Sequence, residues 1–257
     1  MRDIANGYAQ HKTLDVCAAV FIKINLHLLK HKPTMPLQVL EAQTGNPEDS
    51  PVATILIMHG LGADGRDFVP IAQQLDLSSV GPVRYLFPNA PTIPVTINGG
   101  FVMPAWYDIL AADLVKREDE AGLRQSRLQI EEIIANEKAR GIPANRIVVA
   151  GFSQGCAMSL MVGLRHSETL AGIVGMSGYL PLASTMAAEH TTASLKTPVF
   201  MAHGTRDGVV AMPRATASRD ALVAMGYAVE WHEYVMEHSV CPQEVVDLEV
   251  FLKRVLA

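Results

Sequence analysis

Short apolar runs alternate with longer segments of helical periodicity from residue 36 to the end of the chain. Four of the apolar runs lack polar alternation, which is typical of inner strands covered on both faces of a parallel sheet. Segments of helical period between such strands are typical of βαβ units. We therefore predict an α/β fold with strands at 36–43, 53–60, 84–90, 146–152, 172–178, 198–204 and 228–235, and helices near 67–76, 118–140, 154–165, 212–225 and 242–256.

One stretch breaks the alternation. Residues 88–108, PNAPTIPVTINGGFVMPAWYD, contain four prolines and two adjacent glycines, so neither a helix nor a central strand is expected. Long irregular segments inside compact domains are usually binding loops or lids. In a plain surface loop we would not expect four large apolar residues together, such as Phe101, Met103, Trp106 and Tyr107. We interpret the segment as a wall of an apolar pocket.

The composition of the chain indicates a globular protein and argues against some kinds of partner. The 257 residues are 49% hydrophobic and 18% charged, which fits one globular domain with a large core. A net charge of −5 and the lack of Lys/Arg runs longer than two argue against a nucleic-acid partner. Three cysteines without a CxxC pair indicate neither a disulfide framework nor a thiolate zinc site. We expect a protein of the reducing cytoplasm, and a homodimer is compatible with this sequence.

The first residues differ from the rest, so we divide the chain into an extension of unknown role at 1–34 and a domain at 35–257. Within the extension, CAAVFIKINLHLL is broken by Lys23 and Asn25 and is too short to span a bilayer. It also lacks the flanks of a signal peptide, so we predict no stable membrane insertion. The alternatives are an accessory packing segment, an upstream start with Met35 as the working start, and an amphipathic helix on a membrane surface.

The motif GFSQG places Ser153 between Gly151 and Gly155. By itself this motif is weak, because small residues also occur where chain segments merely meet. Here an apolar strand precedes the serine and a helical pattern follows it, as a nucleophile elbow requires. The helix N-terminus would then bring positive dipole and free N–H groups to the serine. We predict that Ser153 is a nucleophile.

A serine nucleophile needs a histidine base. In this architecture the catalytic groups lie on loops after strands, in the order Ser, Asp or Glu, His. His166 lies just beyond the helix after the elbow, His190 in a polar linker and His232 inside a strand. His238, in MEHSVCPQE, lies between the last strand and the last helix. An exposed loop histidine is common, but His238 fits the required place and is the predicted base.

The predicted acid is Asp207, in the loop of MAHGTRDGVV after a strand and between Ser153 and His238 in sequence. Its rivals fit less well, because Asp220 lies within a helix and Glu237 is too close to the base to orient it. We expect His203, at the end of the same strand, to shape the loop.

Two backbone N–H groups are expected to hold an oxyanion. One is that of Gln154, directly after the nucleophile, and the other is that of Leu61, in the glycine-rich loop of LIMHGLGADGRDF. This loop lacks the G-K-[ST] ending of a phosphate loop. It does match G-x-G-x-x-G, but without the acidic residue of a dinucleotide site, so the oxyanion interpretation is preferred.

Six motifs in order resemble the phospholipase/carboxylesterase family of α/β-hydrolases, which includes bacterial carboxylesterases and acyl-protein thioesterases: HGLGADGRDF, NAPTIPVTINGG followed by MPAWYDI, GFSQG, SGYLP, HGTRD and MEHSVCPQE. The resemblance covers residue 36 to the end. It implies an α/β-hydrolase fold, with a mostly parallel central sheet flanked by helices on both faces, and the same triad and oxyanion residues. Two departures stand out: Gly208 and Ala211 replace prolines usual after the acid, and the extension has no counterpart.

The resemblance implies a serine hydrolase that cleaves carboxylic esters, thioesters or lysophospholipids through an acyl-enzyme, without metal or organic cofactor. HEYVMEH matches no zinc pattern. The alternatives are an acyltransferase with the same triad and a non-catalytic binding module of the same fold. The expected substrate is a small acyl ester or thioester, whose apolar acyl site we assign to Phe101, Met103, Trp106 and Leu180.

Overall fold

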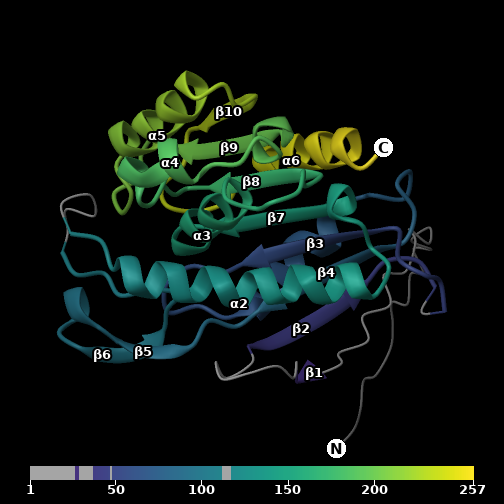
Figure 1. The fold of residues 1–257 in the computed structure, drawn as a ribbon, viewed down its shortest axis with the longest axis horizontal. Helices are drawn as coiled ribbons and strands as arrows, with labels where there is room; N and C mark the ends of the chain where they lie inside the picture. The colour runs from purple at the N-terminus through teal and green to yellow at the C-terminus, as the bar shows by residue number, and fades with distance from the viewer. Residues whose placement is uncertain (1–26, 29–36, 47, 112–116) are drawn as a thin grey trace, which may run out of the picture.

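An eight-stranded sheet lies at the centre of the protein (Figure 1), in a computed structural model that describes residues 27–28, 37–46, 48–111 and 117–257. β1 and β2 are antiparallel to each other, β2 is antiparallel to β4, and the other neighbouring strands are parallel. In spatial order the strands are β1 (His27–Leu28), β2 (Gln38–Gln43), β4 (Val83–Pro88), β3 (Ala53–Met58), β7 (Ile147–Phe152), β8 (Gly172–Met176), β9 (Val199–Gly204) and β10 (Val229–Tyr234).

Helices cover both faces of the sheet, and each face has its own apolar core. On β3, Leu56 and Met58 join one core while Ile55 and Ile57 join the other. This explains the unbroken apolar run of that strand, because both of its faces are buried. The first core includes residues of α2 (Glu120–Ala139), α3 (Gln154–Gly163), α4 (Met186–Glu189) and α5 (Met212–Ala224), and the second includes residues of α1 (Val69–Gln74) and α6 (Pro242–Val255). Figure 1 shows α2 crossing in front of the sheet.

Each predicted strand and helix is present, with ends shifted by a few residues, whereas β1, α4 and the two strands β5 (Thr92–Val95) and β6 (Phe101–Pro104) were not predicted. The first predicted helix is divided into a 3-10 turn, η1, and the short α1. The 3-10 turns are η1 (Gly65–Phe68), η2 (Thr96–Asn98), η3 (Ala144–Arg146), η4 (Ala183–Thr185) and η5 (Ser194–Lys196).

The segment 88–108 contains regular structure, so the expectation of an irregular loop is wrong there. β5 (Thr92–Val95) and β6 (Phe101–Pro104) form an antiparallel hairpin, which Figure 1 shows beside the N-terminal part of α2. Gly99 and Gly100 have φ of 67° and 81°, which side chains rarely adopt, and they form its turn. Prolines are tolerated in a two-stranded ribbon that has no further neighbours, which is why their number misled the prediction.

The predicted extension at 1–34 lies outside the described residues except for His27–Leu28, which pair with β2. The division of the chain at residue 35 therefore stays a prediction. Among the described residues, no helix is both long and apolar enough to cross a membrane.

Candidate active site

Ser153 lies at the sharp turn between β7, which ends at Phe152, and α3, which begins at Gln154. Its φ and ψ are 56° and −116°, a conformation that a residue with a side chain adopts only at a cost. Such strain persists where the surrounding structure holds it, often at functional sites. This is the backbone of a nucleophile elbow, with the hydroxyl presented at the carboxyl end of the sheet.

The flanking glycines are required by close contacts of the backbone. A Cβ on Gly151 would lie 2.1 Å from the carbonyl oxygen of Gly155. A Cβ on Gly155 would lie 2.0 Å from the carbonyl oxygen of Met58, at the end of β3. Neither distance leaves room for any side chain, so α3 can approach β3 and β7 only with glycine at both positions.

A chain of hydrogen bonds joins the three predicted catalytic side chains. Nε2 of His238 lies 2.8 Å from Oγ of Ser153, and Nδ1 of His238 lies 2.7 Å from Oδ2 of Asp207. His238 comes from the loop between β10 and α6, and Asp207 from the loop after β9. Because three different loops meet here, the fold brings together residues separated by up to 85 positions in sequence.

The Asp207 carboxylate is buried but well supplied with donors. Its Oδ1 accepts hydrogen bonds from the backbone N–H groups of Val209 and Val210, both at 2.8 Å. His203, on β9, donates from Nε2 to the carbonyl oxygen of Val210 and lies 3.4 Å from Oδ2 of Asp207. These contacts fix the loop without the prolines usual there, and His203 takes the supporting place expected of it.

The two amides predicted for the oxyanion lie beside the serine. A Cβ on Gly60 would be 3.3 Å from Cβ of Ser153, so the Gly60–Leu61 segment lies against Ser153. Gln154 is the first residue of α3, where an N–H has no partner within the helix. In the described part of the chain, neither N–H donates to a protein acceptor. Both are free to bind an anionic oxygen.

Ser153 and His238 open into a cavity of about 490 Å³. Its apolar lining comes mainly from residues in or close to the motifs: Phe68 and Val240 lie within HGLGADGRDF and MEHSVCPQE, and Val209 lies two residues after HGTRD. Proximity to HGLGADGRDF, HGTRD and MEHSVCPQE is the signal by which sequence reasoning could have found them. The full lining is Gly60, Leu61, Ala63, Asp67, Phe68, Ile71, Phe152, Ser153, Val209, His238, Ser239 and Val240.

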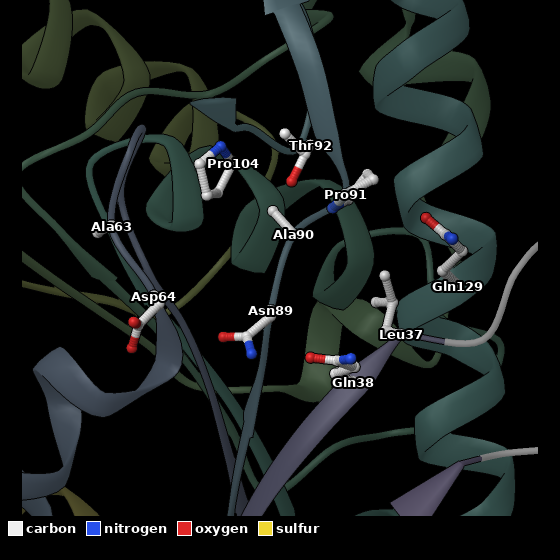
Figure 2. Close-up of a pocket in the computed structure, with 10 residues that line it drawn as sticks. All are labelled: Leu37, Gln38, Ala63, Asp64, Asn89, Ala90, Pro91, Thr92, Pro104 and Gln129. Atoms are coloured by element: carbon white, nitrogen blue, oxygen red, sulfur yellow. The ribbon is translucent and has the colours of Figure 1, made fainter. Parts of the chain in front are cut away.

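A second, larger cavity of about 640 Å³ shares Ala63 with the cavity that contains Ser153. Figure 2 shows it between the start of β2, the loop after β4 and α2, with Asp64, Asn89 and Gln129 around it. Ser153 and His238 do not line it. The smaller cavity is therefore the one in contact with the hydrogen-bonded side chains.

The four residues predicted to bind the acyl group do not line the cavity that contains Ser153. Phe101 projects from the hairpin and is 68% exposed, and Met103 lies next to Gly62. Trp106 is 1% exposed, and its indole N–H donates to the carbonyl oxygen of His59 at 2.8 Å. Leu180 is buried and borders a separate cavity beside α5. In this conformation the four residues do not form a wall of one pocket. Phe101 and Met103 belong to the β5–β6 hairpin, and Trp106 supports the backbone at His59.

The described residues contain no group of three or more His, Cys, Asp or Glu side chains that could hold a metal ion. His232, which drew attention in HEYVMEH, contacts Glu230 through Nε2 at 2.9 Å and stacks near the ring of Phe200. It lies on β10 and does not reach the cavity that contains Ser153.

Comparison with known proteins gives a consistent result. A family model described as phospholipase/carboxylesterase matches residues 40–256. Acyl-protein thioesterase 1 of Mycosarcoma maydis is 40% identical over 237 residues, covering 86% of this chain and 99% of that protein. Acyl-protein thioesterase 1 of Schizosaccharomyces pombe is 42% identical over 178 residues, covering 69% of this chain and 79% of that protein.

Solved structures of similar fold include related proteins from two plants. SOBER1 of Arabidopsis thaliana is 32% identical with a TM-score of 0.76, covering 80% of this chain and 99% of that one. Acyl-protein thioesterase 2 of Zea mays is 28% identical with a TM-score of 0.73, covering 84% of this chain and 99% of that one.

Proposed function

Because the chain belongs to the phospholipase/carboxylesterase family and is a hydrolase of the α/β-hydrolase fold, we propose that Ser153, His238 and Asp207 are its catalytic triad. One observation carries this proposal: His238 is within hydrogen-bond distance of Ser153 through one ring nitrogen and of Asp207 through the other. Asp207 accepts a hydrogen bond from the Nδ1–H of His238, which leaves Nε2 without a proton and able to take that of the serine hydroxyl.

The reaction is acyl transfer to water. His238 removes the proton of Ser153 while Oγ attacks the ester or thioester carbonyl, and the resulting oxyanion accepts hydrogen bonds from the N–H groups of Leu61 and Gln154. His238 then protonates the leaving alcohol or thiol. The same base activates a water molecule that hydrolyses the acyl-enzyme and frees Ser153. No step requires a cofactor.

The substrate class we propose is a small acyl ester or thioester, with the thioester of an acylated protein as the physiological form. The curated relatives reported above are named acyl-protein thioesterases, and the cavity beside Ser153 has an apolar lining suited to an acyl chain. The odd cysteine number of the chain fits a reducing setting, so we infer a cytoplasmic enzyme.

The test compares wild-type protein with Ser153→Ala on a nitrophenyl butyrate ester and on thioesters of increasing acyl length. Removing the nucleophile is expected to lower kcat by about 10³-fold or more. Ser167→Ala is the matched control, because Ser167 is exposed and lies beyond the C-terminal end of α3, whereas Ser153 precedes its N-terminal end. A fluorophosphonate probe should label the wild type and Ser167→Ala but not Ser153→Ala. Equal turnover or labelling in Ser153→Ala would refute the assignment.

A further inference from the structure

A buried histidine, His59, lies directly before the Gly60–Leu61 segment and takes no part in the triad. Its side chain has no exposed surface and packs against the indole of Trp106, with ring centroids 5.2 Å apart. Both ring nitrogens have partners: Nδ1 lies 2.7 Å from the carbonyl oxygen of Gly60, and Nε2 lies 3.0 Å from the backbone nitrogen of Ala90.

These partners fix the tautomer of His59. The backbone N–H of Ala90 can only donate, so Nε2 must accept and carry no proton. The carbonyl oxygen of Gly60 can only accept, so Nδ1 must carry the proton and donate it. Burial lowers the pKa of His59, which agrees with a neutral ring.

The carbonyl held by His59 belongs to the peptide group whose other end is the N–H of Leu61. In a trans peptide the C=O and the following N–H lie in one plane and point in opposite directions. A hydrogen bond to the Gly60 oxygen therefore sets the direction of the Leu61 N–H. A second donor, the N–H of Ala63 at 3.3 Å, also binds that oxygen, but with a longer contact.

Further contacts anchor this segment to its surroundings. The indole N–H of Trp106 holds the carbonyl oxygen of His59, one peptide earlier. The loop after β4 is joined to the loop after β3 by the bond from Ala90 to His59 and by a bond from the N–H of Gly65 to Oδ1 of Asn89 at 2.8 Å. Figure 2 shows Asn89 and Ala90 on that loop, facing Ala63 and Asp64.

The same support reaches the other predicted oxyanion donor. The side chain of Gln154 accepts from the backbone N–H of Trp106 at 2.8 Å and donates to the carbonyl oxygen of Tyr107 at 2.7 Å. Trp106 thus contacts both segments: its indole holds the residue before Gly60, and its backbone holds the side chain of Gln154. One buried network orients the two amides together.

We propose that His59 is a positioning residue, which orients the Gly60–Leu61 peptide through its Nδ1–H so that the Leu61 N–H points at the developing oxyanion. The inference rests on the proposed function, because it assigns a role within the same site. An oxyanion donor acts mainly in the transition state, so loss of its alignment should lower kcat and leave KM nearly unchanged.

Two variants separate the two bonds of the ring. His59→Asn places a side-chain N–H near the position of Nδ1 and can keep the bond to Gly60, whereas His59→Gln can reach the position of Nε2 and keep only the bond to Ala90. Loss of one oxyanion donor typically costs about 10²-fold to 10³-fold in kcat. We expect His59→Gln to lose about 10-fold to 100-fold in kcat, with His59→Asn about tenfold more active than His59→Gln.

A second readout is the affinity for a trifluoromethyl ketone, whose adduct with Ser153 carries an oxyanion; it should weaken in parallel with kcat. Trp106→Phe removes the indole N–H that binds the carbonyl oxygen of His59 but keeps an aromatic ring, and it should also lower kcat at constant KM. This variant keeps the proposal testable if His59→Gln does not fold. Equal kcat in the Asn and Gln variants, or a change confined to KM, would overturn the role of His59. Lack of ester and thioester hydrolysis in the wild type would instead overturn the proposed function.

Discussion

Glu244 offers a test of the physical chemistry of this fold that is independent of activity. The residue lies in the first turn of α6 and is fully buried, and among the described residues neither carboxyl oxygen has a hydrogen-bond partner. Burial raises its pKa from 4.5 to about 8; the nearby backbone N–H of Cys241 opposes this shift, and the charge of Asp247 adds to it. The carboxyl is therefore protonated in the folded protein at neutral pH.

The sign of the pH dependence follows from this pKa. Between pH 4.5 and about 8 the folded protein keeps a proton that the unfolded chain releases, so the free energy of unfolding falls as pH rises through that window. Above about pH 8 this contribution is lost. Since one pH unit corresponds to about 1.4 kcal/mol, the contribution of Glu244 falls by about 1.4 kcal/mol between pH 7 and pH 9.

Glu244→Gln resembles the protonated acid in shape but does not titrate. For a chain of this size, 1.4 kcal/mol corresponds to roughly 3 to 6 °C in Tm. We expect the wild type to lose about that much more Tm than Glu244→Gln when pH rises from 7 to 9. The measurement is thermal unfolding followed by circular dichroism at both pH values, with urea unfolding at 25 °C for the free energies.

The control is Glu48→Gln, because Glu48 is exposed. This variant should follow the wild type at both pH values. The difference between variants removes the contribution of all other titrating groups, including the buried Cys156 and Tyr234 near Glu244. Parallel Tm curves for the wild type and Glu244→Gln would show that Glu244 is ionised in the folded state and would refute the reasoning.

Two further substitutions test the packing that positions the site. Gly155→Ala should destabilise the protein by about 3 kcal/mol or more, because the new Cβ would lie 2.0 Å from the Met58 carbonyl oxygen. Urea unfolding measures this, and Gly208→Ala, where the added Cβ meets nothing within 4 Å, should stay within about 0.5 kcal/mol of the wild type. Glu137→Met should cost about 3 to 5 kcal/mol, because Glu137 is the buried partner of Arg84 at 2.8 Å and of the Thr54 hydroxyl at 2.6 Å. The same change at exposed Glu48 should leave the urea midpoint unchanged, and an equal loss there would contradict the argument.

The sequence by itself determined the strands of the central sheet from β2 onward and the main helices along the chain, though not the β5–β6 hairpin, and it determined the candidates for the triad. Strands such as β3 and β7 are buried on both faces, so their apolar runs are visible without any knowledge of their neighbours. The elbow is local in part: Gly151 is required by the carbonyl oxygen of Gly155 in the same turn, whereas Gly155 is required by the carbonyl oxygen of Met58 on β3. His238 and Asp207 could be chosen because the loops after parallel strands meet at one edge of the sheet.

Only the tertiary structure decided which apolar residues reach the cavity and what the buried polar groups do. Trp106 and Leu180 are apolar residues of the kind that line acyl sites. In the folded protein both are buried outside the cavity that contains Ser153, and the indole of Trp106 is held by His59, 47 residues away in sequence. The tautomer of His59 depends on Ala90, 31 residues away, and the raised pKa of Glu244 depends on burial. These properties arise from the surroundings that other segments provide. No local pattern encodes them, because desolvation and hydrogen-bond partners are set only when the chain is folded.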